Sequence, residues 1–274
     1  RSIAAISSST DPSSYHGFGP FVPGIVKIPY NDITALEESL QDKNVAAFMV
    51  EPIQGEAGVV VPDDDYLKQV RAVCTKNKVL LIADEVQTGI ARTGKLLACD
   101  YANIQPDILI LGKALSGGTM PVSAVLCSDE IMLCIKPGEH GSTFGGNPLA
   151  CAVATASLQV VIDEKLADNA HEMGELFRNG LRSLNHPIIE SVRGKGLLNA
   201  MIIKDSHETE HNWNTDGEIA WNLCLKMRDN GLLAKPTHGN IIRFAPPLVI
   251  TKNQIEDAVQ IIRKSLEDIA PLKN

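Results

Sequence analysis

Hydrophobic and polar positions alternate along the first part of the chain in a pattern typical of an α/β fold. Short apolar runs at residues 45–50 and 79–83 predict buried parallel strands, and residues 107–111 and 121–127 predict two more. Between the first two runs, apolar residues recur at steps of three and four over residues 66–74, which predicts an amphipathic helix. We therefore expect a mostly parallel sheet flanked by helices.

The pattern changes near residue 165. A long apolar helix is predicted before this point and a helix with a polar face after it, and Trp221 is interpreted as a helix core residue. We place a domain boundary here, with a large domain at residues 1–164 and a smaller C-terminal α+β domain at residues 165–274. The second domain is expected to hold strands at residues 196–204 and 241–244. A hydrophilic insertion at residues 208–216 lies between them, and a terminal helix at residues 255–269 follows.

Composition and charge narrow the classes of partner. The chain has 274 residues, with 33 Asp and Glu against 25 Lys and Arg, and its net charge is −8. The basic residues are dispersed, so nothing supplies the attraction to phosphate backbones or anionic lipids that drives non-specific binding. The longest apolar runs are far shorter than the roughly 20 residues of a membrane-spanning helix. Nucleic acid and membrane are therefore not expected partners.

Potential chemistry is concentrated at the ends of two predicted strands. The apolar run at residues 79–83 is followed by Asp84 and Glu85, and the next one is followed by Gly112 and Lys113. Ligands of open α/β sheets lie at the carboxyl edge of the strands, so a carboxylate and an amine are expected at one site. We expect one βαβ unit to connect the two strands.

Two interpretations of these residues compete. The first is a magnesium nucleotide site, because a strand ending in Asp-Glu is combined with a GxxxxGK spacing at residues 89–95. It is weakened by Leu96, which stands where a Ser or Thr hydroxyl would bind magnesium. The second is a pyridoxal phosphate site, which requires a lysine, a carboxylate facing the pyridine nitrogen and a cradle for phosphate.

The residue types fit the second interpretation. Asp84 opposite the pyridine nitrogen would raise the pKa of that nitrogen and keep it protonated, which allows the cofactor to withdraw electrons. Lys113 follows an apolar strand, a setting that favours the neutral amine. The loop at residues 141–147 offers hydroxyls and N–H groups before a helix, as anion sites do, although a turn that caps the helix through Asn147 also accounts for it.

Four motifs, in order along the chain, resemble those of class III pyridoxal phosphate-dependent aminotransferases. They are EPIQGEAGVVVP, LLIADEVQTGIARTGK, ILGKALSGG and GEHGSTFGGNPLA, at residues 51–62, 80–95, 110–118 and 138–150. The segments SSSTDPSSYHGFGPF and GLLAKPTHGNIIRFAPPLVI further resemble the members of that family that act on ornithine. The resemblance implies a fold type I enzyme of proline and arginine metabolism that moves the δ-amino group of ornithine to 2-oxoglutarate. The products would be glutamate 5-semialdehyde and glutamate, and residues 1–164 would be part of the cofactor-binding domain.

The resemblance also assigns roles to the cofactor-binding residues. Lys113 would bond to the cofactor and move the proton, Asp84 would face the pyridine nitrogen, and Gln87 would donate to the phenolic oxygen. Ser142 and Thr143 would reach the cofactor phosphate of a neighbouring subunit, so at least a homodimer is expected.

Substrate choice is assigned to a pair of opposite charges. In the family these residues form a movable ion pair, here Glu56 and Arg243. The Arg would stay paired while ornithine reacts and would be released to bind the α-carboxylate of glutamate. Arg1 aligns with a further Arg that contacts a substrate carboxylate. An ordinary interdomain salt bridge is the alternative for the pair.

Some expectations concern what this sequence lacks. Family members have, before the position of Arg1, a portion that helps to hold the cofactor, so this chain is expected to be a piece of a longer or nicked protein. A catalytically impaired paralogue is the alternative. His140 and His238 have no paired ligand at metal spacing, so no metal site is assigned. The resemblance places the enzyme in the mitochondrial matrix, with the cytoplasm as the alternative.

Overall fold

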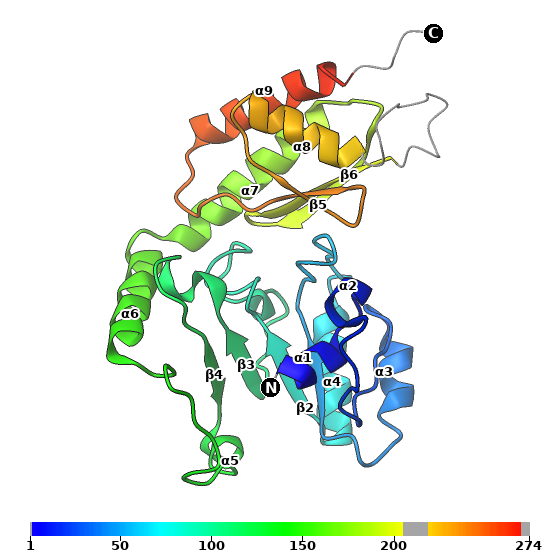
Figure 1. Cartoon of the computed structure of the whole chain (residues 1–274), viewed down its shortest axis with the longest axis vertical. Helices are drawn as coiled ribbons and strands as arrows, with labels where there is room; N and C mark the ends of the chain where they lie inside the picture. Colours follow the sequence, from blue (N-terminus) through cyan, green and yellow to red (C-terminus); the bar gives the residue numbers. More distant parts are fainter. Residues whose placement is uncertain (1, 205–218, 270–274) are drawn as a thin grey trace.

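The structure, a computed structural model, describes residues 2–204 and 219–269. Two groups of strands and helices follow each other along the chain, and in Figure 1 they occupy the lower and upper halves of the molecule. The helices of the described residues are α1 (Ser2–Ser8), α2 (Pro12–Tyr15), α3 (Ile33–Ser39), α4 (Tyr66–Asn77), α5 (Asp129–Met132), α6 (Pro148–Asp163), α7 (Leu166–Ser183), α8 (Ile219–Asp229) and α9 (Lys252–Glu267). The strands are β1 (Ala47–Val50), β2 (Leu80–Asp84), β3 (Ile108–Leu111), β4 (Ala124–Cys127), β5 (Ile189–Lys195), β6 (Leu198–Ile203), β7 (Lys235–Thr237) and β8 (Ile241–Phe244).

The first sheet has the strand order β1-β2-β3-β4. Its first three strands are parallel and β4 is antiparallel to β3, so the predicted, mostly parallel sheet is confirmed. The register pairs Asp84 of β2 with Ile110 of β3, so Asp84 and Lys113 emerge at the same edge of the sheet.

The connection between β2 and β3 differs from the prediction. In this fully described stretch the α-helix of a βαβ unit is missing, and a 3-10 turn, η1 (Ala98–Tyr101), takes its place. The buried carboxylate of Glu85 accepts hydrogen bonds from the Thr88 hydroxyl at 2.6 Å and from the amides of Ala98 and Cys99 at 2.9 and 2.8 Å. Glu85 thereby closes the connection into a compact loop beside the end of β2.

The second sheet is antiparallel throughout, with the order β5-β6-β8-β7. Helices α7, α8 and α9 cover it, and buried residues of all three helices, such as Phe177, Leu223 and Ile262, share one hydrophobic core with it. The expected smaller α+β unit is thus present, while the boundary at residue 164 stays a prediction. Trp221 in α8 is 51% exposed, so its interpretation as a core residue was wrong. The hydrophilic insertion at residues 208–216 lies outside the described residues.

Arginine side chains join the two sheets. The Arg92 guanidinium donates to the carbonyls of Leu197 and Pro246 at 3.2 and 2.5 Å, and Arg193 donates twice to the Gly58 carbonyl, at 3.1 and 2.8 Å. The turn before β6 packs closely against the loop that follows β2. A Cβ on Gly196 would lie only 2.2 Å from the carbonyl carbon of Thr93 in that loop.

These contacts bear on the nucleotide interpretation. The loop at residues 89–95 is buried for most of its length, with Ile90 and Ala91 in a hydrophobic core and Thr93 against the turn before β6. A loop packed in this way has no room for a triphosphate, because phosphates are cradled by exposed backbone N–H groups.

Within residues 2–204 and 219–269, no helix is both long enough and apolar enough to cross a membrane.

Candidate active site

Lys113 lies directly after β3, at the start of the 3-10 turn η2 (Lys113–Ser116). Its backbone has φ 42°, a left-handed conformation that is uncommon for a side chain other than glycine and that recurs at functional sites. Burial lowers the pKa of its amine below the ordinary value, and the charge of Arg243 adds to this, although Glu56 opposes it. A larger share of Lys113 is therefore neutral than of an exposed lysine at the same pH.

Asp84 ends the neighbouring strand β2, where its carboxylate accepts a hydrogen bond from the Val86 amide at 3.0 Å. It lies near enough to Lys113 for its charge to act on the pKa of the amine. The carboxylate and the amine thus lie in one cluster rather than in separate cavities.

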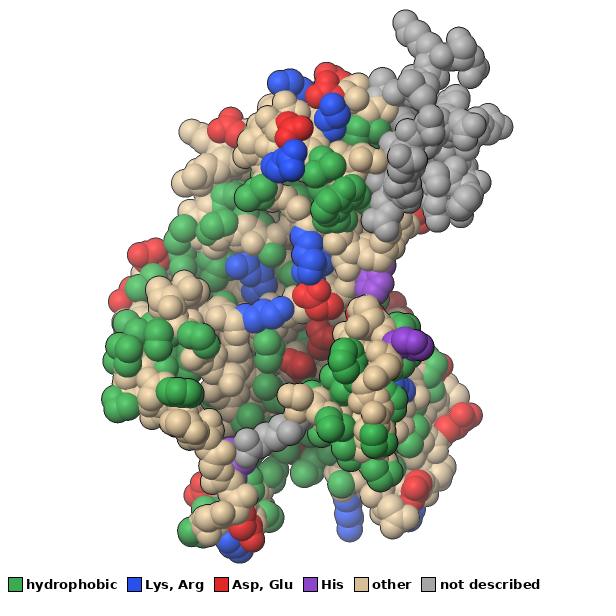
Figure 2. Space-filling view, in the orientation of Figure 1, with side chains coloured by type: hydrophobic (Ala, Val, Ile, Leu, Met, Phe, Trp, Pro, Cys, Tyr) green, Lys and Arg blue, Asp and Glu red, His purple; other side chains and the backbone are tan. Residues whose placement is uncertain are grey.

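Glu56 is the centre of this cluster. Its Oε1 lies 3.0 Å from Arg243 Nη1, 3.8 Å from Lys113 Nζ and 3.3 Å from Gln87 Nε2, and its Oε2 lies 3.4 Å from Lys235 Nζ. Burial acts to raise the pKa of the Glu56 carboxyl, but the Arg243 hydrogen bond and the neighbouring cations outweigh it and hold the pKa below its ordinary value. Figure 2 shows basic and acidic side chains gathered in the middle of one face, between the two halves of the molecule.

Arg243, in β8, reaches this cluster from the second sheet. Its Nη1 also donates to the Gly55 carbonyl at 2.9 Å, so it binds both the side chain and the backbone of the turn that carries Glu56. Its Nε is buried and has no hydrogen-bond partner among the described residues. A buried donor without an acceptor is unfavourable, which is consistent with a group that changes partners.

Two residues of the cluster were missed from the sequence. Glu51, the residue after β1, accepts from the Gly55 amide at 3.0 Å, and burial raises the pKa of its carboxyl. The same carboxyl-edge argument that selected Asp84 also applies to Glu51. The other residue is Lys235, which only the register of β7 against β8 places opposite Arg243.

The remaining predicted residues are not part of this cluster in the described structure. Ser142 and Thr143 are exposed, in the loop that precedes α6, and the Ser142 hydroxyl accepts from the Gly145 amide of the same loop. The Asn147 side chain caps α6 by accepting from the Ala150 amide at 2.9 Å. Arg1 lies outside the described residues.

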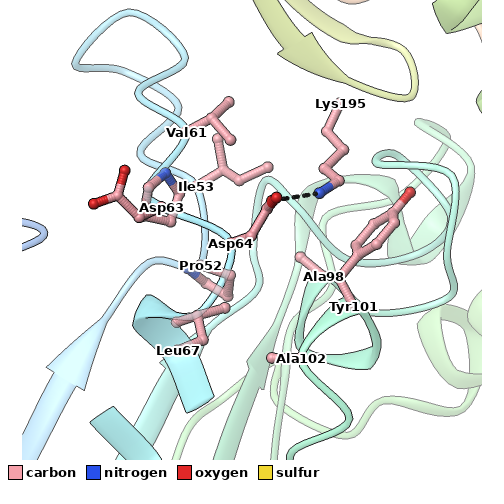
Figure 3. Close-up of a pocket in the computed structure, with 11 residues that line it drawn as sticks. Pro52, Ile53, Val61, Asp63, Asp64, Leu67, Ala98, Tyr101, Ala102 and Lys195 are labelled. Atoms are coloured by element: carbon pink, nitrogen blue, oxygen red, sulfur yellow. Dashed lines mark ion pairs between the residues drawn. The ribbon is translucent and has the colours of Figure 1, made fainter. Parts of the chain in front are cut away.

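A separate small pocket lies between the loop that follows β1 and η1 (Figure 3). Lys195 reaches into it from β5, 3.8 Å from Asp64 and 4.2 Å above the ring of Tyr101. The volume of this pocket, about 40 Å³, has room for water but not for a cofactor. The pocket is therefore not a candidate for the main site.

Comparison of the sequence with known families supplies the deciding observation. Residues 1–266 match the family Aminotransferase class-III. The chain belongs to the class-III aminotransferases. The mostly parallel sheet with its flanking helices is the fold type I architecture expected of this family.

Individual class-III aminotransferases are very similar to this chain. It is 64% identical to the mitochondrial ornithine aminotransferase of Drosophila melanogaster over 97% of this chain and 59% of that protein. The mitochondrial ornithine aminotransferase of Rattus norvegicus is 60% identical over 97% of this chain and 58% of its own length. A solved ornithine aminotransferase of Toxoplasma gondii, with partial occupancy of pyridoxal phosphate at its active site, matches with a TM-score of 0.91 and 51% identity. That match covers 97% of this chain and 61% of the other, so the chain spans about three fifths of the length of these relatives.

Proposed function

We propose that the protein that carries this chain is a pyridoxal phosphate-dependent ornithine aminotransferase. It transfers the δ-amino group of ornithine to 2-oxoglutarate and yields glutamate 5-semialdehyde and glutamate. The observation that carries this proposal is the meeting of Lys113 with the Glu56–Arg243 pair in one cluster. The names of relatives at 60–64% identity support the choice of ornithine as the amino donor.

The residues of the cluster fit the cofactor. Lys113 offers an amine whose pKa is lowered by burial, as bonding to an aldehyde requires, and Asp84 offers a carboxylate from the next strand. When bound, pyridoxal phosphate supplies an electron sink for bond cleavage at the carbon that carries the reacting amine. Lys113 Nζ would bond to the cofactor at rest and then carry a proton. Asp84 would hold a proton on the pyridine nitrogen, and Gln87 would donate to the phenolic oxygen.

Glu56 and Arg243 would select between the two substrates. The reacting end of ornithine carries no carboxylate, and Arg243 then stays on Glu56 and Gly55. Glutamate carries a carboxylate beside its amine, which a released Arg243 guanidinium would bind with two parallel hydrogen bonds. The unpaired Arg243 Nε supports this role, because it is a donor that a substrate carboxylate can satisfy.

Replacing Arg243 with alanine is expected to lower kcat/KM for the glutamate half-reaction by about 50-fold, because a bidentate ionic contact is lost. The ornithine half-reaction should fall by less than about fivefold. Single-turnover kinetics with each substrate measure the two values. Arg263→Ala, an exposed position on α9, is the matched control. Equal losses in both half-reactions would favour an ordinary salt bridge.

We also propose a homodimer, in which Ser142 and Thr143 reach the cofactor phosphate of the partner. Phe144, next to them, is 80% exposed, and Leu149 in the first turn of α6 is 62% exposed. Apolar side chains exposed beside a polar loop are typical of an interface between subunits.

The mitochondrial names of relatives support a location in the mitochondrial matrix.

A panel of amino donors tests the proposed reaction. With 2-oxoglutarate as acceptor, the complete protein is expected to use ornithine at least about tenfold faster than acetylornithine or 4-aminobutyrate. Formation of glutamate and of the semialdehyde is measured for each donor. Preference for another donor would overturn the substrate assignment, and no turnover with any donor would favour the impaired paralogue.

A further inference from the structure

Three cations surround the Glu56 carboxylate, and two of them, Arg243 and Lys235, come from neighbouring strands. Arg243 lies 3.0 Å from Oε1, and Lys235 lies 3.4 Å from Oε2. The two residues are direct partners in the antiparallel pairing of β7 with β8. Removing Arg243 from Glu56 would therefore leave a cation on the other oxygen of the same carboxylate.

The turn that carries Glu56 is also held independently of Arg243. The Thr237 hydroxyl donates to the Glu56 carbonyl at 3.2 Å, and the His238 ring nitrogen Nε2 lies 3.1 Å from the same oxygen. Both residues belong to the end of β7 and the turn that follows it. Glu56 can thus stay in place while the Arg243 side chain moves.

We propose that Lys235 is a specificity-determining residue that promotes the release of Arg243 toward substrates with an α-carboxylate. The inference rests on the proposed function, in which Arg243 leaves Glu56 when glutamate or 2-oxoglutarate is bound. Lys235 does not touch the substrate in this scheme. It sets how readily Arg243 becomes free.

Two electrostatic effects of Lys235 have the same sign. While Arg243 is paired, the positive charges of Lys235 and Arg243 lie on one carboxylate and repel each other, which weakens the pair. Once Arg243 has left, Lys235 still compensates the charge of Glu56, so the released state is less unfavourable. The Lys235 side chain is 65% exposed, so solvent screens both effects and the expected change is about two- to fivefold.

The proposal predicts different results for a neutral replacement of Lys235 and for a replacement that keeps its positive charge. In Lys235→Met of the complete holoenzyme, the dissociation constants of glutamate and 2-oxoglutarate should rise about two- to fivefold. The constant for ornithine and the limiting rate of each half-reaction should change by less than about 1.5-fold. Lys235→Arg should restore wild-type values. Lys264→Met, which removes the same charge at an exposed position of α9, is the control.

Single-turnover titrations with each substrate, together with the thermal midpoint of each variant, provide the readout. Equal changes for glutamate and ornithine would overturn the proposal, as would a Lys235→Arg variant that behaves like Lys235→Met. If the wild-type protein does not use ornithine, the proposed function fails. The role of Lys235 is then read from glutamate against 4-aminobutyrate, whose reacting end has no carboxylate.

Discussion

Replacing Lys113 with alanine is expected to lower the rate of amino transfer by about 10⁴-fold or more. The variant would lose the amine proposed to bond to the cofactor and, with it, the group proposed to carry the proton. Lys113 lies 3.8 Å from Glu56 at the end of β3, on the side of the sheet edge where Asp84 also emerges. Steady-state turnover of ornithine with 2-oxoglutarate measures the loss.

A covalent label distinguishes this role from a structural one. Wild-type protein treated with pyridoxal phosphate and then borohydride should carry the reduced cofactor on Lys113, as peptide mapping detects. The Lys113→Ala variant should carry none, and Lys68→Ala, at an exposed position of α4, should label and turn over as the wild type does. A label on a different lysine, with Lys113 unmodified, contradicts the assignment.

Replacing Glu85 with alanine is expected to lower the free energy of unfolding by about 3–5 kcal/mol. The Glu85 carboxylate is 0% exposed and accepts from the Thr88 hydroxyl and from the amides of Ala98 and Cys99. The substitution leaves these three donors without an acceptor inside the fold and opens a cavity. Urea unfolding of the complete protein, followed by circular dichroism, measures the change.

Two further variants calibrate the Glu85 result. Glu85→Gln keeps the shape and one acceptor oxygen, so its loss should be intermediate. Glu38→Ala, on the exposed face of α3, should change the free energy of unfolding by less than about 0.5 kcal/mol. A Glu85→Ala variant as stable as Glu38→Ala is incompatible with the hydrogen bonds described for this carboxylate.

The first sheet could be predicted because its strands are short apolar runs. Three of the four predicted runs contain the whole observed strand. The fourth, at residues 79–83, ends one position before β2 ends at Asp84. β5 and β7 were missed for physical reasons. β5 has only two apolar side chains, Ile189 and Val192, which are three positions apart and so lack the period of two that marks a half-buried strand. β7 is a strand of three residues that contains Pro236. Their formation depends on pairing with β6 and β8, which a local pattern does not contain.

The site residues also fall into two groups, those that a local sequence rule selects and those that only the tertiary structure brings together. Asp84 and Lys113 could be selected from the sequence because parallel strands bring their carboxyl ends to one edge, and Glu51 satisfies the same rule. The contact of Lys235 with Glu56 depends on how the second sheet docks on the first, so no spacing in the sequence predicts it. Trp221 shows the converse error, since an apolar residue in a helix need not face the core.

The turn at Gly55 and the strand residue Arg243 are 188 positions apart, yet they are hydrogen-bonded. Contacts over such separations form late in folding, because the intervening chain must first be ordered. Until then Glu51, Glu56 and Asp84 leave the edge of the first sheet rich in negative charge, with Lys113 as the cation beside them in the described cluster. While β8 is still inside the ribosome, the chain has Lys113 but lacks Arg243, so the pair proposed to select between substrates has not yet formed.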